Sequence, residues 1–237
     1  MQPSPMKAKF IKRKQKHGRS ANAGLTLIEC LVAIVVIAAT AASIGPMMVF
    51  SVATRVQNQR TEQALQIAQA EVDKVRLVVE QGGDYGDRLN NLKLFRVNAA
   101  SIAEVPAPNA FIDSTASVTS ERQARRIDID GDGTSDFAIQ LFRTPGIELP
   151  SQTAGVTAST PVVFDYGVRV YDDAAAEQNI TSLTASTTSL GFTSGEGDRG
   201  RQPLAVLYGQ MGQGDRDASL CQYWQYAGST PTTLQCN

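Results

Sequence analysis

Hydrophobic residues dominate one continuous stretch near the N-terminus, residues 25–54, which reads LTLIECLVAIVVIAATAASIGPMMVFSVAT. A single charged residue, Glu29, interrupts the stretch, and none occurs from Cys30 to Thr54. A membrane-spanning helix needs about 20 consecutive apolar residues. We therefore predict a transmembrane helix over residues 25–54.

The apolar residues become periodic after this stretch. They recur three and four positions apart, which places them on one face of a helix, at Leu65, Ala68, Val72, Val75 and Val79. The opposite side is polar and holds Arg55, Glu62, Gln66, Gln69, Asp73, Arg76 and Glu80. Gly82 and Gly83 follow, and glycine is favoured just after a helix C-terminus. The pattern predicts that the same helix continues as an amphipathic segment over residues 55–82.

The remaining chain, residues 83–237, shows short alternating runs instead of helical periodicity. Strands are predicted over residues 136–142, 162–171 and 204–208, with residues 127–129 as a weaker candidate. Residues 151–160 and 178–202 are rich in Ser, Thr, Gly and Ala and are predicted to be loops. The expected fold class is α+β: a long N-terminal helix packed on a small antiparallel sheet in an extracytoplasmic head.

Charge is distributed unevenly between the N-terminus and the rest of the chain. Residues 1–24 hold no carboxylate and seven of the 22 basic residues, so the chain from residue 25 onward has 15 basic and 23 acidic side chains, a net charge of −8. The positive-inside tendency then keeps residues 1–24 in the cytoplasm and places the head outside. An acidic head also argues against direct binding of nucleic acid, which depends on Lys and Arg.

Catalysis is not predicted from the sequence. The single histidine, His17, lies in the basic segment, so a chain that begins at Leu25 has no histidine for a catalytic triad or a metal site. An ordinary secretory signal peptide would also combine a basic and an apolar segment, but its apolar region is about 7 to 15 residues long. Glu29 is a further departure, since a carboxylate in an apolar helix is costly without a partner.

The basic segment followed by Gly24-Leu25-Thr26-Leu27-Ile28-Glu29 and an apolar helix resembles the processing site of type IV prepilins and type II secretion pseudopilins. The resemblance implies that a prepilin peptidase cleaves between Gly24 and Leu25 and methylates the new amine. Leu25 departs from the commoner phenylalanine but is also large and apolar. Residues 1–24 are then a cleaved leader.

The same resemblance implies roles for two residues of the apolar helix. Glu29 would neutralise the N-terminal amine of a neighbouring subunit when helices pack in a fibre, because both charges are otherwise stranded in an apolar core. The alternative is a glutamate that reaches water at the membrane edge. Pro46 lies where pilins often carry a kinking proline, and its missing N–H predicts a bend. Cys30 is interpreted as a small apolar residue and not as a lipidation site.

A narrower resemblance rests on the stretch Ser51-Val52-Ala53-Thr54-Arg55-Val56-Gln57, which is similar to cyanobacterial pseudopilins of hormogonium polysaccharide secretion. It implies a minor pseudopilin of the inner membrane that assembles with other pilin subunits on an inner-membrane platform for polysaccharide export and gliding. Two alternatives remain open at this point: a minor type IV pilin for adhesion or DNA uptake, and an anchored calcium-dependent binding module that does not assemble.

The head contains an aspartate-rich loop, DIDGDGTSD, over residues 128–136. Hard oxygen ligands at alternate positions favour calcium, and the loop matches the first half of an EF-hand, with ligands predicted from Asp128, Asp130, Asp132, Thr134 and Asp136. Ile139 stands where an EF-hand has its bidentate glutamate, so a true EF-hand is not expected. The sequence predicts structural Ca²⁺; the alternative is a solvated turn between strands.

Two cysteines, Cys221 and Cys236, lie 15 positions apart near the C-terminus. This placement suits a disulfide outside the reducing cytoplasm and resembles the C-terminal disulfide loop of many pilins; two free thiols are the alternative. The intervening aromatic residues, Tyr223, Trp224 and Tyr226, are expected either to cover the sheet or to form a surface for a partner.

Overall fold

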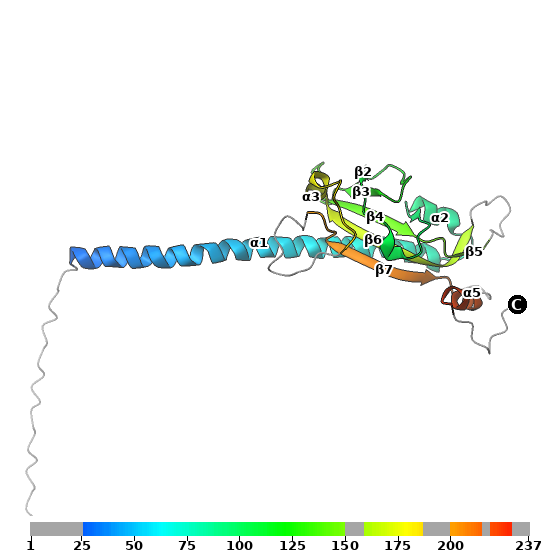
Figure 1. Ribbon diagram of the computed structural model, residues 1–237, viewed down its shortest axis with the longest axis horizontal. Coiled ribbons are helices and arrows are strands. Elements are labelled where there is room, and N and C mark those ends of the chain that lie inside the picture. Colours follow the sequence, from blue (N-terminus) through cyan, green and yellow to red (C-terminus); the bar gives the residue numbers. More distant parts are fainter. Residues whose placement is uncertain (1–25, 150–158, 187–199, 215–218, 229–237) are drawn as a thin grey trace, which may run out of the picture. The chain divides into compact units, whose positions relative to one another are not determined.

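The computed structural model describes residues 26–149, 159–186, 200–214 and 219–228 (Figure 1). The chain divides into two compact units, Met1–Ala53 and Thr54–Asn237. The long helix α1 (Leu27–Glu80) begins in the first unit and ends in the second, as the hydrophobic pattern predicts.

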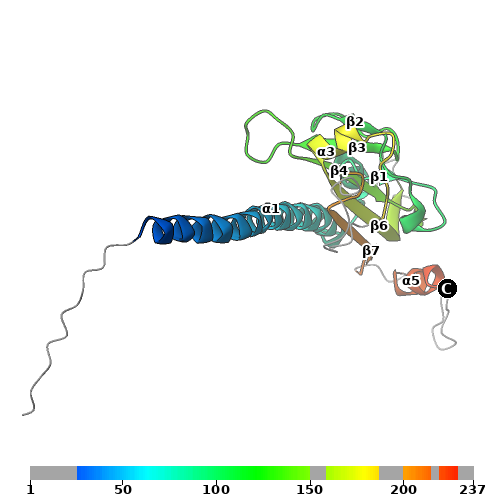
Figure 2. The same ribbon diagram turned by 60° about the vertical axis from the view of Figure 1, so that its left-hand side comes forward.

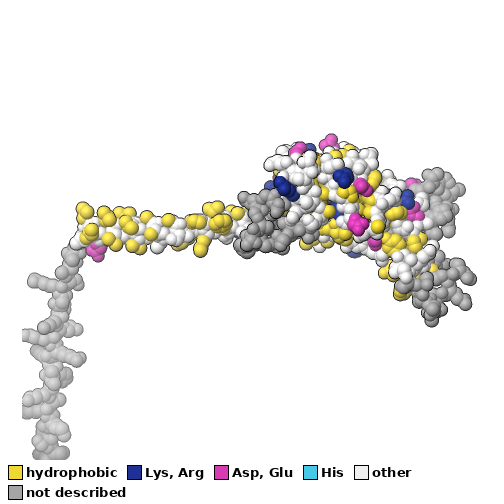
Figure 3. Space-filling model, in the orientation of Figure 1, with side chains coloured by type: hydrophobic (Ala, Val, Ile, Leu, Met, Phe, Trp, Pro, Cys, Tyr) yellow, Lys and Arg dark blue, Asp and Glu magenta, His cyan; other side chains and the backbone are white. Residues whose placement is uncertain are grey.

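The part of α1 in the first unit is an apolar rod. Every side chain from Leu27 to Ala53 is exposed, and hydrophobic side chains cover its surface (Figure 3). Among the described residues, α1 is the helix whose length and composition suffice to cross a membrane. It continues through Pro46, and the bend expected there stays a prediction.

The second unit contains a seven-stranded sheet. Its strands are β1 (Phe95–Arg96), β2 (Ala110–Ile112), β3 (Gln123–Ile127), β4 (Phe137–Arg143), β5 (Ile147–Leu149), β6 (Thr160–Asp172) and β7 (Ala205–Gly212). The order is β2-β3-β4-β6-β5, with β1 added to β4 and β7 to the free side of β6. Short helices accompany the sheet: η1 (Ile102–Glu104), α2 (Gly86–Asn91), α3 (Asp173–Gln178) and α5 (Ser219–Tyr226).

The α+β architecture is confirmed, but the sheet is mixed and not wholly antiparallel. The pairs β1–β4 and β2–β3 are parallel, whereas β3–β4, β4–β6, β5–β6 and β6–β7 are antiparallel. Parallel neighbours need a connection longer than a hairpin. The chain between Ile112 and Gln123 provides such a connection between β2 and β3.

The strands predicted at residues 136–142 and 162–171 correspond to β4 and β6. The candidate at residues 127–129 was misplaced, because β3 ends at Ile127 and the preceding arginines, Arg125 and Arg126, obscured its apolar alternation. β7 extends beyond the predicted residue 208 to Gly212, since pairing with β6 stabilises a glycine-containing segment of low intrinsic β-propensity.

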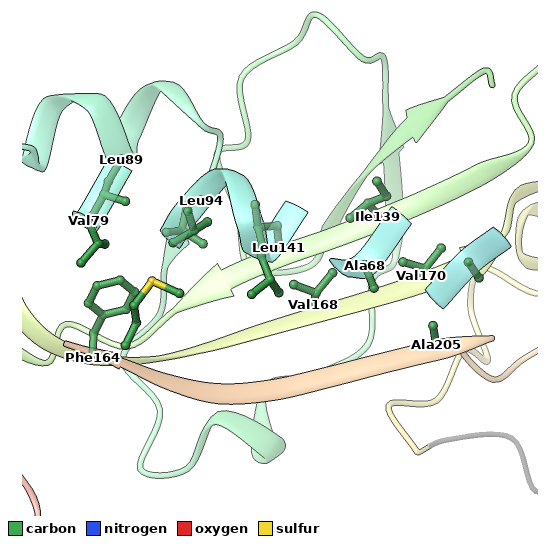
Figure 4. Packing of buried hydrophobic residues seen from close by; sticks show 14 of the residues in the cluster. Ala68, Val79, Leu89, Leu94, Ile139, Leu141, Phe164, Val168, Val170 and Ala205 are labelled. Carbon is green, nitrogen blue, oxygen red and sulfur yellow. The ribbon is translucent and has the colours of Figure 1, made fainter. Parts of the chain in front are cut away.

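The core lies between one face of the sheet and the part of α1 beyond residue 63 (Figures 1 and 2). The small residues Ala64 and Ala68 and the valines that follow face β4, β6 and β7, and Figure 4 shows Ala68 and Val79 over this face. The buried residues of this helix face are Ala64, Ala68, Glu71, Val72, Val75 and Val79. The prediction for Leu65 was wrong, because Leu65 is 41% exposed and Ala64 occupies the face instead. All seven residues predicted for the polar side are exposed.

Glu71 is a charged residue on this buried face, which the apolar periodicity did not predict. Its Oε1 atom lies 3.1 Å from Arg125 Nη2 on β3 and 2.8 Å from Lys74 Nζ. A carboxylate beneath a sheet is tolerated when cations compensate it. The pair therefore fixes β3 onto α1.

The outer face of the sheet is held by Arg169 of β6, which has no exposed surface. Its guanidinium lies 4.9 Å from the ring centre of Phe142 and 5.5 Å from that of Tyr208. It donates to the carbonyl oxygens of Val105, at 2.7 Å, and of Ala103, at 3.3 Å. Arg169 thereby binds the irregular segment containing η1 to the sheet.

Candidate processing, assembly and metal-binding sites

The predicted processing residues, Gly24 and Leu25, lie outside the described residues. Glu29 is placed in the first turn of α1, where its backbone N–H donates to the carbonyl oxygen and the Oγ1 of Thr26, at 3.0 and 3.3 Å. A carboxylate in the first helical turn interacts favourably with the helix dipole. Within the described part of the chain, Glu29 has no ion-pair partner.

The aspartate-rich loop connects β3 and β4, and its carboxylates accept hydrogen bonds from backbone N–H groups of the same loop. The Oδ1 and Oδ2 atoms of Asp128 accept hydrogen bonds from the N–H groups of Gly131 and Gly133, at 2.7 and 2.9 Å. Asp136 Oδ2 accepts from the N–H of Ile129 at 2.9 Å. The positive φ of Gly131 and Gly133, 77° and 88°, allows this tight path.

Three of the predicted ligands converge. One carboxylate oxygen each from Asp128, Asp130 and Asp136 lies within 4.8 Å of the other two. Two ligands of one calcium ion lie at most about 5 Å apart, because each is about 2.3 to 2.6 Å from the ion. The spacing and the all-oxygen chemistry of these three carboxylates therefore fit calcium.

Asp132 does not join this group. Its Oδ1 accepts from the N–H and the Oγ1 hydroxyl of Thr134, at 2.7 and 2.5 Å. These hydrogen bonds, that of the Thr134 hydroxyl above all, lower the pKa of Asp132 below its ordinary value. The predicted ligand Asp132 is therefore engaged with Thr134 through Oδ1 and is not one of the three converging carboxylates.

The chain anchors this loop to the end of the sheet. The N–H of Asp136 donates to the carbonyl of Ile127 at 2.9 Å, and the carbonyl of Asp136 accepts from the N–H of Asp173 at 3.0 Å. Asp173 pairs with Arg126 Nε at 3.1 Å, while burial raises the pKa of the Asp173 carboxyl. The adjacent Asp172 caps α3 through Ala175 and forms an ion pair with Arg60 of α1.

These supporting residues were not predicted as part of the site. The available signal was the position of Asp172 immediately before an Ala-rich run, which is typical of a helix N-cap. Sequence spacing could not show that Asp173 lies beside Arg126 and Asp136, because β6 is distant from β3 and β4 in the chain and only the pairing of these strands brings the residues together.

The C-terminal aromatic residues behave differently from one another. The hydroxyl of Tyr226 on α5 donates to Asp165 Oδ2 of β6 at 2.9 Å, which supports the prediction that part of this segment covers the sheet. Tyr223 is 42% exposed and lies edge-on to Trp224, with 6.2 Å between ring centres.

Cys30 is a free thiol and Cys221 is disulfide-bonded. Cys236 lies outside the described residues, so its pairing with Cys221 stays a prediction.

Comparison with protein families matches residues 19–45 to the family described as the prokaryotic N-terminal methylation motif. This segment contains Gly24, Leu25 and Glu29 and the apolar stretch as far as Gly45. No curated protein and no solved structure matches the chain. The methylation motif and the apolar helix on an α+β head together support a membrane-anchored, type IV pilin-like prepilin, for which processing by prepilin peptidase and assembly with other pilins are implied.

Proposed function

We propose that the chain is a minor pseudopilin, a non-catalytic structural subunit of a pilus-like fibre that serves polysaccharide secretion and gliding motility. The observation that carries the pilin class is the methylation motif at residues 19–45, followed by a helix with no buried residue before Ala64. The stretch Ser51 to Gln57, which resembles polysaccharide-secretion pseudopilins, favours this system.

The proposed mechanism is mechanical. The uncleaved chain crosses the inner membrane once, with its N-terminus in the cytoplasm and its head outside. After cleavage at Leu25, the helix moves from lipid into a fibre of parallel helices on an inner-membrane assembly platform. The charge of Glu29 then requires compensation in an apolar environment, and the new N-terminal amine of a neighbouring subunit supplies it.

Two other functions make different predictions. A minor type IV pilin would support adhesion or DNA uptake, although the acidic sequence after residue 24 disfavours direct contact with DNA. A membrane-anchored calcium-dependent binding module would be cleaved or uncleaved without assembling. The latter possibility rests on the aspartate-rich loop alone.

The decisive experiment follows processing and assembly in the same cells. N-terminal sequencing of the membrane-extracted protein should give Leu25 when prepilin peptidase is present and the uncleaved start when it is absent. Glu29→Ala should remove the chain from sheared fibres, whereas Glu62→Ala, which changes an exposed carboxylate of the same helix, should not. Another N-terminus would refute the pilin class, and fibres unaffected by Glu29→Ala would refute the assembly role of that residue.

The export system is tested by deleting the gene. Loss of extracellular polysaccharide and gliding, restored by the wild-type chain but not by Glu29→Ala, is the expected result. Normal export with a loss of DNA uptake or adhesion would favour the minor type IV pilin instead.

We further propose that Asp128, Asp130 and Asp136 bind a structural Ca²⁺, with Asp132 and the carbonyl of Thr134 completing the set. Calcium would relieve repulsion among carboxylates held within 4.8 Å. At a concentration 100 times its Kd, it should stabilise the head by about 2.7 kcal/mol. Melting with calcium and with EDTA measures this difference. Asp128→Asn should abolish the difference in melting temperature between calcium and EDTA, and Asp113→Asn should preserve it. A wild-type melting temperature that is the same with calcium and with EDTA would rule out the site.

A further inference from the structure

Strand β7 forms an edge of the sheet that is open among the described residues. β7 pairs with β6 in a regular antiparallel register from Ala205 to Gly212, and no other described strand pairs with it. The N–H of Gln213 donates to the carbonyl of Val162 at 2.8 Å. Because hydrogen bonding alternates along an antiparallel strand, the backbone groups of Val206, Tyr208 and Gln210 face away from β6.

This edge lacks the features that usually prevent strand pairing between molecules. β7 has eight residues, AVLYGQMG, without a charge or a proline. Its register against β6 has no shift, in contrast to the irregularity between β5 and β6. Long, uncharged edges are templates for pairing with another chain, and proteins normally protect them with charges, prolines or bulges.

The opposite edge of the same sheet is formed by β2, Ala110-Phe111-Ile112, which also has no charge or proline. β2 is parallel to β3, and three successive antiparallel pairings lead from β3 through β4 and β6 to β7. β2 and β7 therefore run in opposite directions. In two copies with the same orientation, β7 of one copy can meet β2 of the next as an antiparallel pair.

We propose that β7 of one copy of this chain pairs with β2 of the next copy in the fibre. The inference rests on the proposed function, because assembly of cleaved subunits that all entered the membrane with one polarity gives the copies a common orientation. The contact uses two different surfaces, so it joins copies that are neighbours in the fibre head to tail instead of closing them into a dimer. The length of β2 limits the pairing to a short ladder, and helix packing supplies the remaining contact.

Cysteine cross-linking in intact cells tests this arrangement. In a Cys30→Ala background, one tagged chain carries Gln210→Cys and a second, differently tagged chain carries Phe111→Cys, whose side chain is on the same sheet face. We expect a mixed-tag cross-linked dimer only when both chains are present. The Arg126 guanidinium lies 5.3 Å from the ring centre of Phe111. If loss of this contact affects folding, Asp113→Cys provides a second position, exposed and two residues further along the same face. Tyr223→Cys with Phe111→Cys is the matched control and should not cross-link.

The outcomes separate the two proposals. Wild-type chains that enter sheared fibres without any mixed-tag cross-link, or a Gln210→Cys chain that cross-links to itself, would overturn the β7–β2 contact and leave the proposed function standing. A cleaved chain that stays monomeric would overturn both.

Discussion

Replacing Glu71 by glutamine should separate the contribution of a buried ion pair from that of an exposed one on the same helix. Glu71 is 6% exposed on the core face of α1, with Arg125 Nη2 at 3.1 Å and Lys74 Nζ at 2.8 Å. The substitution preserves the shape of the side chain and removes its charge. Arg125, whose side chain is 17% exposed, then keeps its charge beneath the sheet without a carboxylate.

The expected cost follows from this burial. Removing one partner of a fully buried pair costs about 3 to 5 kcal/mol. Lys74 is mostly solvated and Arg125 retains some access to water, so we expect about 2 to 3 kcal/mol here. For a domain of this size, each kcal/mol lowers the melting temperature by about 2 to 4 °C, which gives a decrease of about 4 to 12 °C.

The matched control is Asp73→Asn, which breaks the exposed pair of Asp73 with Arg76, 3.4 Å apart on the solvent side of α1. An exposed pair of this spacing contributes about 0.5 kcal/mol or less. Urea unfolding of the full chain in detergent, followed by Trp224 fluorescence, compares the two variants. Equal destabilisation by Glu71→Gln and Asp73→Asn would refute the reasoning. Adding Arg125→Met to Glu71→Gln should recover part of the loss, because the unpaired cation is then removed.

Two further predictions concern the outer sheet face and the aspartate-rich loop. Gly167→Ala should destabilise the head by about 1 to 3 kcal/mol, because the added methyl group would lie 2.6 Å from Phe142 Cε2. Gly214→Ala, which meets no atom within 4 Å, is the control in the same unfolding experiment, and equal stability of the two variants would contradict the packing of Phe142 over Gly167. Thr134→Val should raise the pKa of Asp132 toward its ordinary value of 3.8 in a carboxyl NMR titration without calcium, because the Thr134 hydroxyl is the main cause of its lowering. The stability due to Asp132 is present above pH 3.8 and is lost as the pH falls through the lowered pKa. Thr134→Val should therefore reduce the slope of stability against pH in this acidic range. An unchanged pKa of Asp132 would contradict the role of the Thr134 hydroxyl.

The sequence predicted the features that depend on local periodicity. The apolar stretch, the helix end before Gly82 and the strands β4 and β6 follow directly from the spacing of apolar residues. Leu65 was predicted on the buried face in place of Ala64, because the two residues lie three and four positions before Ala68 and both spacings fit a helix face. Only packing against the sheet selects the smaller residue. The parallel pairing of β2 with β3 depends on the path of a connection that carries no periodic signal.

The candidate metal site shows the same division. The alternating aspartates and the glycines correctly predicted a tight loop, because these residues are close in sequence. Which carboxylates converge was not predictable, since Thr134 holds Asp132 by two hydrogen bonds while Asp136 is positioned by the sheet. Glu71 was missed because its burial depends on Arg125, 54 positions away in the sequence.

Arg169 has a consequence for how the head unfolds. The segment around η1 has almost no regular structure, and such segments usually open independently of the core. Here its carbonyl groups are bound to a guanidinium with no exposed surface, which cannot lose its charge. Lifting the segment away would break the hydrogen bonds of Arg169 to its carbonyl groups and leave the cation with Tyr208, Gln140 and the two aromatic rings. Local opening is thereby coupled to loss of the sheet itself, so this irregular segment belongs to the same cooperative unit as β4 and β6.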